Sequence, residues 1–140
     1  MLVYVIVVNW NGKENLRECL YSLKVQSYQN AKIIVVDNGS SDGSVEFIRK
    51  HYPQVKLILL DKNYGFGAAN NIAIEYSLEH GAEAVVLLNN NCIVESHWLD
   101  YLVKALKQNS NIGACAPQLL FRNNPKKLME LVSSWINFIC

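Results

Sequence analysis

The fold of this chain is decided by the stretch IIVVDNGSSDGS, residues 33–44. Four consecutive β-branched apolar residues lead directly into Asp37, and a turn with two glycines follows before a helical pattern begins near Val45. A continuous apolar run of this kind is typical of a strand that is buried on both faces of a parallel sheet. The stretch therefore predicts a strand–turn–helix unit with polar residues at the carboxyl end of its strand.

The same unit recurs along the chain. Apolar runs predict strands at residues 2–8, 32–36, 55–60 and 84–88, with a weaker fifth at 112–117. Apolar residues at helical spacing predict four helices, marked by Leu16, Leu20 and Leu23; by Val45, Phe47 and Ile48; by Ile72, Ile74 and Leu78; and by Leu99, Leu102, Val103 and Leu106. This alternation predicts an α/β fold, with a mostly parallel, Rossmann-like sheet and helices on both of its faces.

The bulk composition describes an ordinary globular domain. The chain has 140 residues, of which 51% are hydrophobic and 18% charged, and this fits a single folded domain. A formal net charge of +1 gives no general attraction for nucleic acid or for an acidic membrane surface. The first apolar run lacks a basic lead-in and is too short to cross a bilayer, and no other segment is long enough to cross one.

The cysteines point to a reducing compartment. Cys19, Cys92, Cys115 and Cys140 show no spacing that is typical of a metal cage or of a redox motif. Scattered free thiols suit the cytoplasm, where disulfides are rare. We therefore expect a cytoplasmic protein, with an association at the membrane surface left open.

Polar residues follow each of the first four predicted strands. The segments are NWNG at 9–12, DNGS at 37–40, DKNYG at 61–65 and NNNC at 89–92. In open α/β sheets, ligands bind beyond the carboxyl ends of the strands, near a reversal of the strand order. We therefore expect a ligand site at this edge, although plain connecting loops can have a similar composition.

Asp37 is the first candidate for contact with a ligand. A carboxylate at the end of a buried strand can accept a hydrogen bond from the imide of a uracil or from a ribose. The alternative is that Asp37 only caps the turn at 38–43, but Asp42 and Ser44 are better placed to cap the helix that begins near Val45. Trp10, just beyond the first strand, can either stack on a nucleobase or pack into the core.

Two further segments carry weaker signals. GFGAAN, residues 65–70, opens a helix, and small residues at a helix N-terminus allow the backbone to approach phosphate. The segment lacks the third glycine of the dinucleotide-binding fingerprint and follows the third strand instead of the first. NNN at 89–91 offers three neutral amides, which are poor ligands for magnesium or manganese and are equally consistent with a polar turn.

Four segments together resemble the family 2 glycosyltransferases, in particular their rhamnosyltransferase-like members. They are VVNWNG at 7–12, VVDNGSSDGS at 35–44, NYGFGAANN at 63–71 and LLNNN at 87–91, and the likeness runs from Val3 to about Phe121. The resemblance implies a GT-A fold, which is a Rossmann-like nucleotide-binding domain. It also implies an inverting transfer of a sugar from a nucleotide-diphosphate donor, UDP- or dTDP-linked, to an acceptor hydroxyl.

The resemblance also assigns roles to individual residues. Asp37 matches the aspartate that recognises the base, and Trp10 lies beside that base, next to Asn9. The other donor-binding residues that it implies are Asn9, Asn63, Gly65, Asn70, Asn89 and Asn90. The family holds Mn²⁺ or Mg²⁺ with an aspartate at the position of Asn91, so the metal ligand is altered here.

The end of the chain departs from the family. The general base and the acceptor-binding region of the family lie further downstream, so the chain is expected to be truncated and no catalytic residue is assigned. Residues 1–121 are predicted to form the donor-binding domain. Residues 122–140 are predicted to form a solvated turn, with Arg122, Lys126 and Lys127 beside Pro125, and then an amphipathic helix. The apolar stripe of this helix, expected to dock on the sheet or on a second copy of the chain in a homodimer, is Leu128, Leu131, Val132, Trp135, Ile136 and Ile139.

Two other classes of function remain open from the sequence. A non-catalytic nucleotide-binding or assembly module is consistent with the amide at Asn91, the short length and the apolar tail. An NAD-dependent oxidoreductase is suggested by Gly65 and Gly67, but it is disfavoured because no glycine-rich turn follows the first strand.

Overall fold

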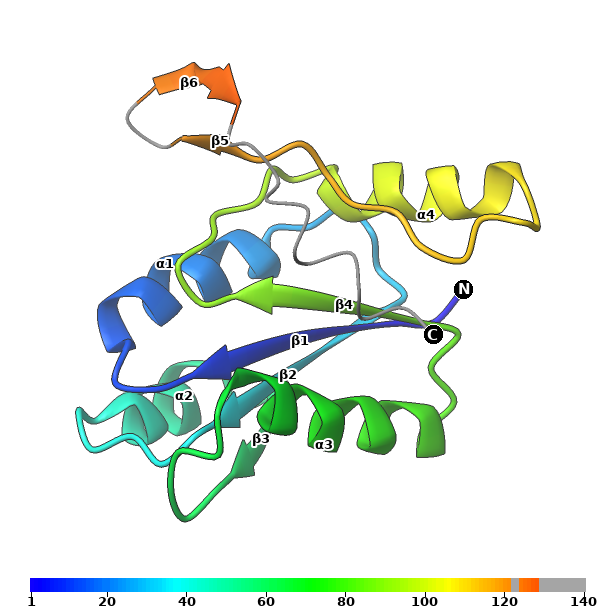
Figure 1. Ribbon diagram of the computed structural model, residues 1–140. Coiled ribbons are helices and arrows are strands. Elements are labelled where there is room, and N and C mark those ends of the chain that lie inside the picture. Colours follow the sequence, from blue (N-terminus) through cyan, green and yellow to red (C-terminus); the bar gives the residue numbers. More distant parts are fainter. Residues whose placement is uncertain (122–123, 129–140) are drawn as a thin grey trace. The chain divides into compact units, whose positions relative to one another are not determined.

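The computed structural model describes residues 1–121 and 124–128 of the chain. The chain divides into two compact units, Met1–His97 and Trp98–Cys140. The first unit is an α/β domain and contains all four segments that carry the family resemblance. The second contains a helix and a short strand pair. Figure 1 shows the order of the helices and strands along the chain.

The first unit is built on a four-stranded parallel sheet. Its strands, in the spatial order β3-β2-β1-β4, are β1 (Val3–Asn9), β2 (Ala31–Asp37), β3 (Lys56–Leu59) and β4 (Ala84–Asn89). The strands β2 and β3 lie on one side of β1, whereas β4 lies on its other side. The strand order therefore reverses between β1 and β4, which confirms the predicted α/β class and places the expected ligand crevice at their carboxyl ends.

Three helices cover the two faces of this sheet. They are α1 (Lys13–Lys24), α2 (Ser44–His51) and α3 (Phe66–Glu79). Right-handed crossovers put α3 on the face opposite to α1, because α3 connects its strands in the opposite direction along the sheet (Figure 1). The helix α1 buries Leu16, Leu20 and Leu23, as its apolar spacing predicts.

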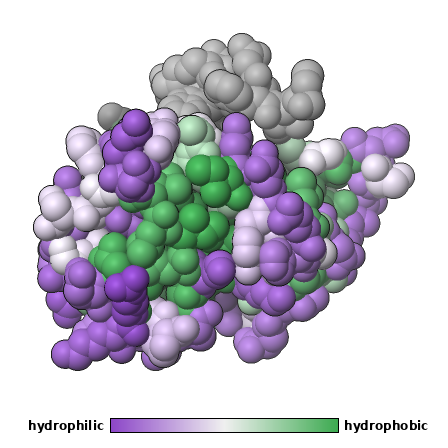
Figure 2. All heavy atoms as spheres, turned by 90° about the horizontal axis from the view of Figure 1, so that it is seen from below, coloured by the Kyte–Doolittle hydropathy of each residue, from purple (hydrophilic) through white to green (hydrophobic). Residues whose placement is uncertain are grey.

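The face beneath α3 is packed differently from the prediction. Ile72 and Leu78 of the predicted stripe are exposed, whereas Ala69, Ala73 and Ser77 are buried. The small residues let the helix approach the sheet closely, and the periodicity of the large apolar residues missed this. Figure 2 shows apolar residues gathered at the surface on the side of the molecule where α3 lies. The core cluster under α3 comprises Tyr4, Ile6, Val8, Ile34, Val36, Ala69 and Ala73.

The second unit corrects two further predictions. Its helix α4 (Trp98–Gln108) buries Leu99 and Val103 as expected. The predicted strand at 112–117 is wrong, because the chain there is irregular and mostly exposed and so has no face to bury in a sheet. The strands β5 (Leu120–Phe121) and β6 (Asn124–Leu128) pair antiparallel instead, so Lys126 and Lys127 lie in a strand and not in a turn.

The predicted amphipathic tail is not tested. Leu128 ends strand β6, so it does not begin a helix, and the rest of the stripe and Arg122 lie outside the described residues. The predicted homodimer and the boundary after residue 121 therefore stay predictions. Within 1–121 and 124–128, no helix is long and apolar enough to cross a membrane.

Gly39, in the turn after β2, is required by both its backbone angle and its surroundings. Its φ is +78°, and an added Cβ would lie 2.7 Å from the Lys62 Cα atom. Gly39→Ala should therefore lower the free energy of unfolding by about 2–4 kcal/mol, from the unfavourable φ and from the clash together. Gly81 is the matched control, because its φ is +80° and its surroundings are open. Gly81→Ala should cost only about 1 kcal/mol in urea unfolding. Equal losses of unfolding free energy in the two variants would show that the contact with the Lys62 backbone does not contribute to the cost.

Candidate functional site

The carboxyl ends of β1, β2 and β4 are joined by the side chain of Asn9. Parallel pairing sets Asn9 opposite Asp37 and Val8 opposite Asn89. The Asn9 Nδ2 donates to Asp37 Oδ2 and to Ser40 Oγ, each at 3.2 Å. Its Oδ1 accepts a hydrogen bond of 2.9 Å from Asn90 Nδ2. One buried amide therefore connects the three strand ends on both sides of the strand-order reversal.

Asp37 is held in one orientation at this edge. Its side chain is only 2% exposed, and its second oxygen, Oδ1, accepts the Ser40 backbone N–H at 2.9 Å. The turn-capping contact that the sequence left as an alternative is therefore present. A carboxylate has about four acceptor positions, so these two bonds leave capacity for a further donor. Contact with a ligand stays a prediction.

Asp42 joins the starts of two helices. Its Oδ2 accepts the Lys13 backbone N–H at 2.9 Å, and its Oδ1 accepts the Ser44 backbone N–H at 3.0 Å as well as the Ser44 hydroxyl. Burial by itself would raise the pKa of Asp42, but these hydrogen bonds outweigh it and hold the pKa below its ordinary value. Asp42 is thus an anionic brace between α1 and α2, consistent with the capping role expected for it.

Trp10 lies just outside the β1 strand and is 56% exposed. The following residue, Asn11, has a φ of 48° and is fixed by two bonds to the β2–α2 turn. Its N–H donates to Ser40 Oγ at 2.9 Å, and its Oδ1 accepts the Ser41 N–H at 2.8 Å. The indole therefore sits at the surface on a braced loop, as a base-stacking residue must, and does not pack into the core.

Asn38 is a structural part of the site that the sequence reasoning missed. It is 2% exposed, and its side chain binds the β3–α3 loop through three hydrogen bonds. Its Nδ2 donates to Asn63 Oδ1 at 2.9 Å and to the Gly65 carbonyl at 3.3 Å, and its Oδ1 accepts the Tyr64 N–H at 2.9 Å. An asparagine inside a polar turn has no periodicity, so only its place beside Asp37 could have drawn attention to it.

Asn70 is a predicted site residue that, like Asn9 and Asp37, is buried. It is 3% exposed, and its Nδ2 donates to the Phe66 carbonyl one turn earlier in α3. Asn63 and Gly65, by contrast, are exposed at the loop that Asn38 holds. The structure thus links Asn63 and Gly65 to Asp37 through its neighbour, and gives Asn70 a bond that supports the first turn of α3.

The segment Asn89–Asn91 does not supply a metal site by itself. Asn89 and Asn91 are exposed, and the amide of Asn90 is engaged with Asn9. All three are neutral, whereas Mg²⁺ and Mn²⁺ prefer anionic oxygen ligands. No group of three His, Cys, Asp or Glu side chains that could hold a metal occurs in the described part of the chain. The residues present therefore do not fit a metal held by protein ligands alone.

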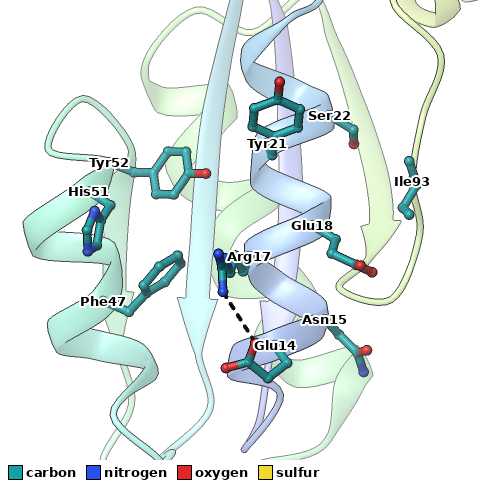
Figure 3. A pocket seen from close by; sticks show the side chains of 10 residues that line it. All are labelled: Glu14, Asn15, Arg17, Glu18, Tyr21, Ser22, Phe47, His51, Tyr52 and Ile93. Atoms are coloured by element: carbon teal, nitrogen blue, oxygen red, sulfur yellow. Dashed lines mark ion pairs between the residues drawn. The ribbon is translucent and has the colours of Figure 1, made fainter.

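A separate groove runs along α1 and α2. Its volume is about 1170 Å³, and Figure 3 shows Arg17 and Tyr21 facing Phe47 and Tyr52 across it. Arg17 and Glu14 form an exposed ion pair of 3.8 Å at its rim. None of the predicted donor-binding residues lines this groove. We therefore keep the candidate site at the strand ends, where the polar side chains converge.

The parallel sheet with its strand-order reversal, and the polar residues at its strand ends, define a Rossmann-like α/β domain. The sequence matches the family described as Glycosyl transferase family 2 over residues 4–135, and the chain therefore belongs to that family. This confirms the resemblance on which the residue assignments rest.

Individual relatives agree with this assignment. The chain is 29% identical over 122 residues to the dTDP-rhamnosyl transferase RfbF of Shigella flexneri, covering 86% of this chain and 40% of that protein. The fold is that of TarS from S. aureus, solved in complex with UDP-GlcNAc (TM-score 0.68, 22% identity, 87% of this chain, 38% of TarS). It is also that of the mannosyltransferase PcManGT from Pyrobaculum calidifontis, solved with GDP-Man and Mn²⁺ (TM-score 0.69, 26% identity, 84% of this chain, 36% of PcManGT). These likenesses confirm the GT-A fold, and the chain spans well under half the length of each of these proteins.

The cysteine beside this edge should be chemically inert. The Cys19 Sγ atom is 3.8 Å from the Asn89 carbonyl, and burial raises the pKa of Cys19 to about 12. At pH 8 only about one thiol in 10⁴ is then ionised. In the native chain, iodoacetamide followed by peptide mass spectrometry should modify the exposed Cys115 and leave Cys19 unmodified. Both should react after denaturation. Alkylation of native Cys19 at a rate near that of Cys115 would contradict the burial.

Proposed function

We propose that this chain binds the nucleotide-diphosphate part of a glycosyl donor at the carboxyl ends of β1, β2 and β4. The observation that carries the proposal is the bonded set Asn90–Asn9–Asp37, which lies at the reversal of strand order. Ligands of open α/β sheets bind at this place. Membership of a glycosyltransferase family supports a nucleotide-linked sugar as that ligand.

The base is assigned to Asp37 and Trp10. A fixed carboxylate suits the imide N–H of uracil or thymine, because a charged acceptor strengthens the bond. The exposed indole of Trp10 offers a flat apolar face to the same ring. The similarity to a dTDP-rhamnosyl transferase supports a pyrimidine base. We therefore assign UDP- or dTDP-linked sugars as the donor class.

The diphosphate is assigned to the β3–α3 and β4–α4 loops. At Gly65 and Gly67 an added Cβ would meet nothing within 4 Å, so the start of α3 is open to an approaching ligand. Backbone N–H groups at a helix N-terminus favour an anion. Asn63, Asn89 and Asn90 add neutral amides around it, while Asn70 supports the helix turn from inside.

The reaction that we propose for a protein with this donor site is an inverting transfer of the sugar to an acceptor hydroxyl. A carboxylate general base takes the hydroxyl proton, the oxygen attacks the anomeric carbon, and the nucleoside diphosphate leaves from the opposite side. We assign no general base among the residues of this chain. Its own residues hold and orient the donor.

A non-catalytic nucleotide-binding module is the second candidate, favoured by the amide at Asn91. Titration of the chain with UDP, dTDP and GDP, followed by incubation with the corresponding donor sugars and sugar acceptors, separates the two. Binding with transfer supports the enzyme, and binding without transfer or hydrolysis supports the module. Absence of all nucleotide binding would overturn both.

Asp37→Ala should weaken the binding of UDP or dTDP by about 1–3 kcal/mol, the range of a hydrogen bond to a charged group. Isothermal titration calorimetry measures this directly. Asp37→Asn, which keeps the side-chain volume, should show a loss of similar direction because the charged acceptor is gone. Glu75→Gln, an exposed position on α3, is the matched control and should bind normally. Unchanged affinity in both Asp37 variants would refute the base assignment.

Asn91→Asp should strengthen manganese binding in the presence of UDP by about 10–100-fold, because it adds a full negative charge for a hard cation. Without nucleotide, the unmodified chain should bind manganese negligibly. Asn15→Asp adds the same charge at an exposed position on α1 and should leave manganese affinity unchanged. If Asn91→Asp behaved like Asn15→Asp in the same titration, residue 91 would not face the diphosphate.

A further inference from the structure

We infer that Asn9 is a positioning residue that orients Asp37 for the nucleobase and does not itself touch the donor. The inference rests on the proposed function, because it concerns the same site. Asn9 has no exposed surface, although it stands at the end of a strand that points to the ligand edge. Its three side-chain hydrogen bonds all go to protein groups. A side chain in this state acts on a ligand through its neighbours.

The direction of the Asn9 amide is fixed by the Asp37 carboxylate, which can only accept hydrogen bonds. The Asn90 Nδ2 donates to Asn9 Oδ1 at 2.9 Å, which leaves the Asn9 Nδ2 turned toward Asp37 and Ser40. If the amide were reversed, its oxygen would face the Asp37 carboxylate and its N–H groups would face the Asn90 donor. Both contacts would be repulsive. The Asn9 amide therefore connects the β4–α4 loop to Asp37 at the end of β2.

Asp37 needs this second restraint. The Ser40 N–H fixes one carboxylate oxygen at 2.9 Å, and the Asn9 amide fixes the other at 3.2 Å. With one hydrogen bond on each oxygen, the carboxylate is held against rotation about its Cβ–Cγ bond more firmly than it is by a single hydrogen bond. A preset plane lowers the ordering cost when the imide of a base binds.

Gly12 provides an independent sign that the Asn90–Asn9 contact shapes the site. A Cβ at Gly12 would lie 2.3 Å from Asn90 Nδ2 and 3.0 Å from Asn9 Oδ1. The φ of Gly12 is −123°, which any residue can adopt, so an added Cβ would act here only through its contacts with these two side chains. The β1–α1 loop thus closes directly over this hydrogen bond. Gly12→Ala should displace the Asn90 amide without altering Asn9 or Asp37 covalently.

The test is a double-mutant cycle on UDP and dTDP affinity, measured by calorimetry. Asn9→Ala should weaken binding about tenfold in the unmodified chain, and less than about twofold when Asp37→Ala is already present. Gly12→Ala should weaken binding about threefold in the unmodified chain and by a smaller factor in the Asp37→Ala background, where only the direct effect of Asn90 on the diphosphate remains. Because Gly12→Ala keeps the buried amide, it tests the inference even if Asn9→Ala does not fold. Ser77→Ala removes a buried hydroxyl from α3 and is the control for loss of stability without loss of binding.

The outcomes separate the inference from the proposed function. A loss from Asn9→Ala that vanishes, and a loss from Gly12→Ala that shrinks, in the Asp37→Ala background support the positioning role, since a purely structural role would lower stability and act independently of Asp37. Normal binding by the unmodified chain, with losses from Asn9→Ala and Gly12→Ala that persist in full without Asp37, would overturn the inference alone. No binding of any nucleotide by the unmodified chain would overturn the proposed function and the inference with it.

Discussion

The burial of a polar side chain at the end of the central strand is the constraint on which the rest of this edge depends. An amide removed from water without partners costs several kcal/mol, about 1–3 kcal/mol even by protein mutational data. Asn9 is completely buried, so its amide must be satisfied by neighbours. Among the residues that the structure describes, no buried side-chain nitrogen or oxygen lacks a hydrogen-bond partner. Satisfying Asn9 fixes the relative positions of the loops that follow β1, β2 and β4.

A second set of amides extends this order to the remaining loop. The backbone of Asn38 is bonded to the end of β1, because its N–H donates to the Asn9 carbonyl at 2.8 Å. Its side chain then holds the β3–α3 loop at Asn63, Tyr64 and Gly65. The four loops are therefore not independent connectors. Each loop is hydrogen-bonded to the loop of the neighbouring strand in the sheet through buried Asn9 or Asn38. These bonds give a ligand at the edge a prearranged surface.

Much of the fold could be predicted from the sequence because strands buried on both faces leave continuous apolar runs. The four strands of the parallel sheet were predicted to within a residue or two at each end, and α1 buries the leucines that its spacing indicates. Where burial uses small residues, as at Ala69 and Ala73, hydrophobic periodicity carries little signal. The fifth strand failed for a related reason, since apolar residues at 112–117 have no partner strand to cover them.

The candidate site was predictable to a different extent from the fold. Strand ends can be read from the sequence, and these gave Asn9, Asp37 and the amides of β4. The role of each of these residues cannot be predicted from the sequence, because it depends on hydrogen bonds between residues far apart in the chain. Asn9, Asn63 and Asn70 are the same residue type in the sequence, yet the structure buries Asn9 and Asn70 and exposes Asn63. Only the folded structure, in which the parallel register sets Asn9 against Asp37, shows which asparagine is buried and which one is exposed.

The family resemblance leads us to expect an aspartate where this chain has Asn91, and this difference has a consequence that follows from charge alone. A carboxylate at position 91 would repel a diphosphate at short range unless a cation stood between them, and such repulsion is strong where water is partly excluded. The exposed amide of Asn91 removes the anionic metal ligand and the repulsion at the same time. Asp37 then remains the buried carboxylate of this edge, and the Asn9 amide lies between it and Asn90 of the β4–α4 loop. At the proposed donor site, a diphosphate would be held by neutral amides and backbone N–H groups, and a metal would contribute less to its binding than it does beside an aspartate.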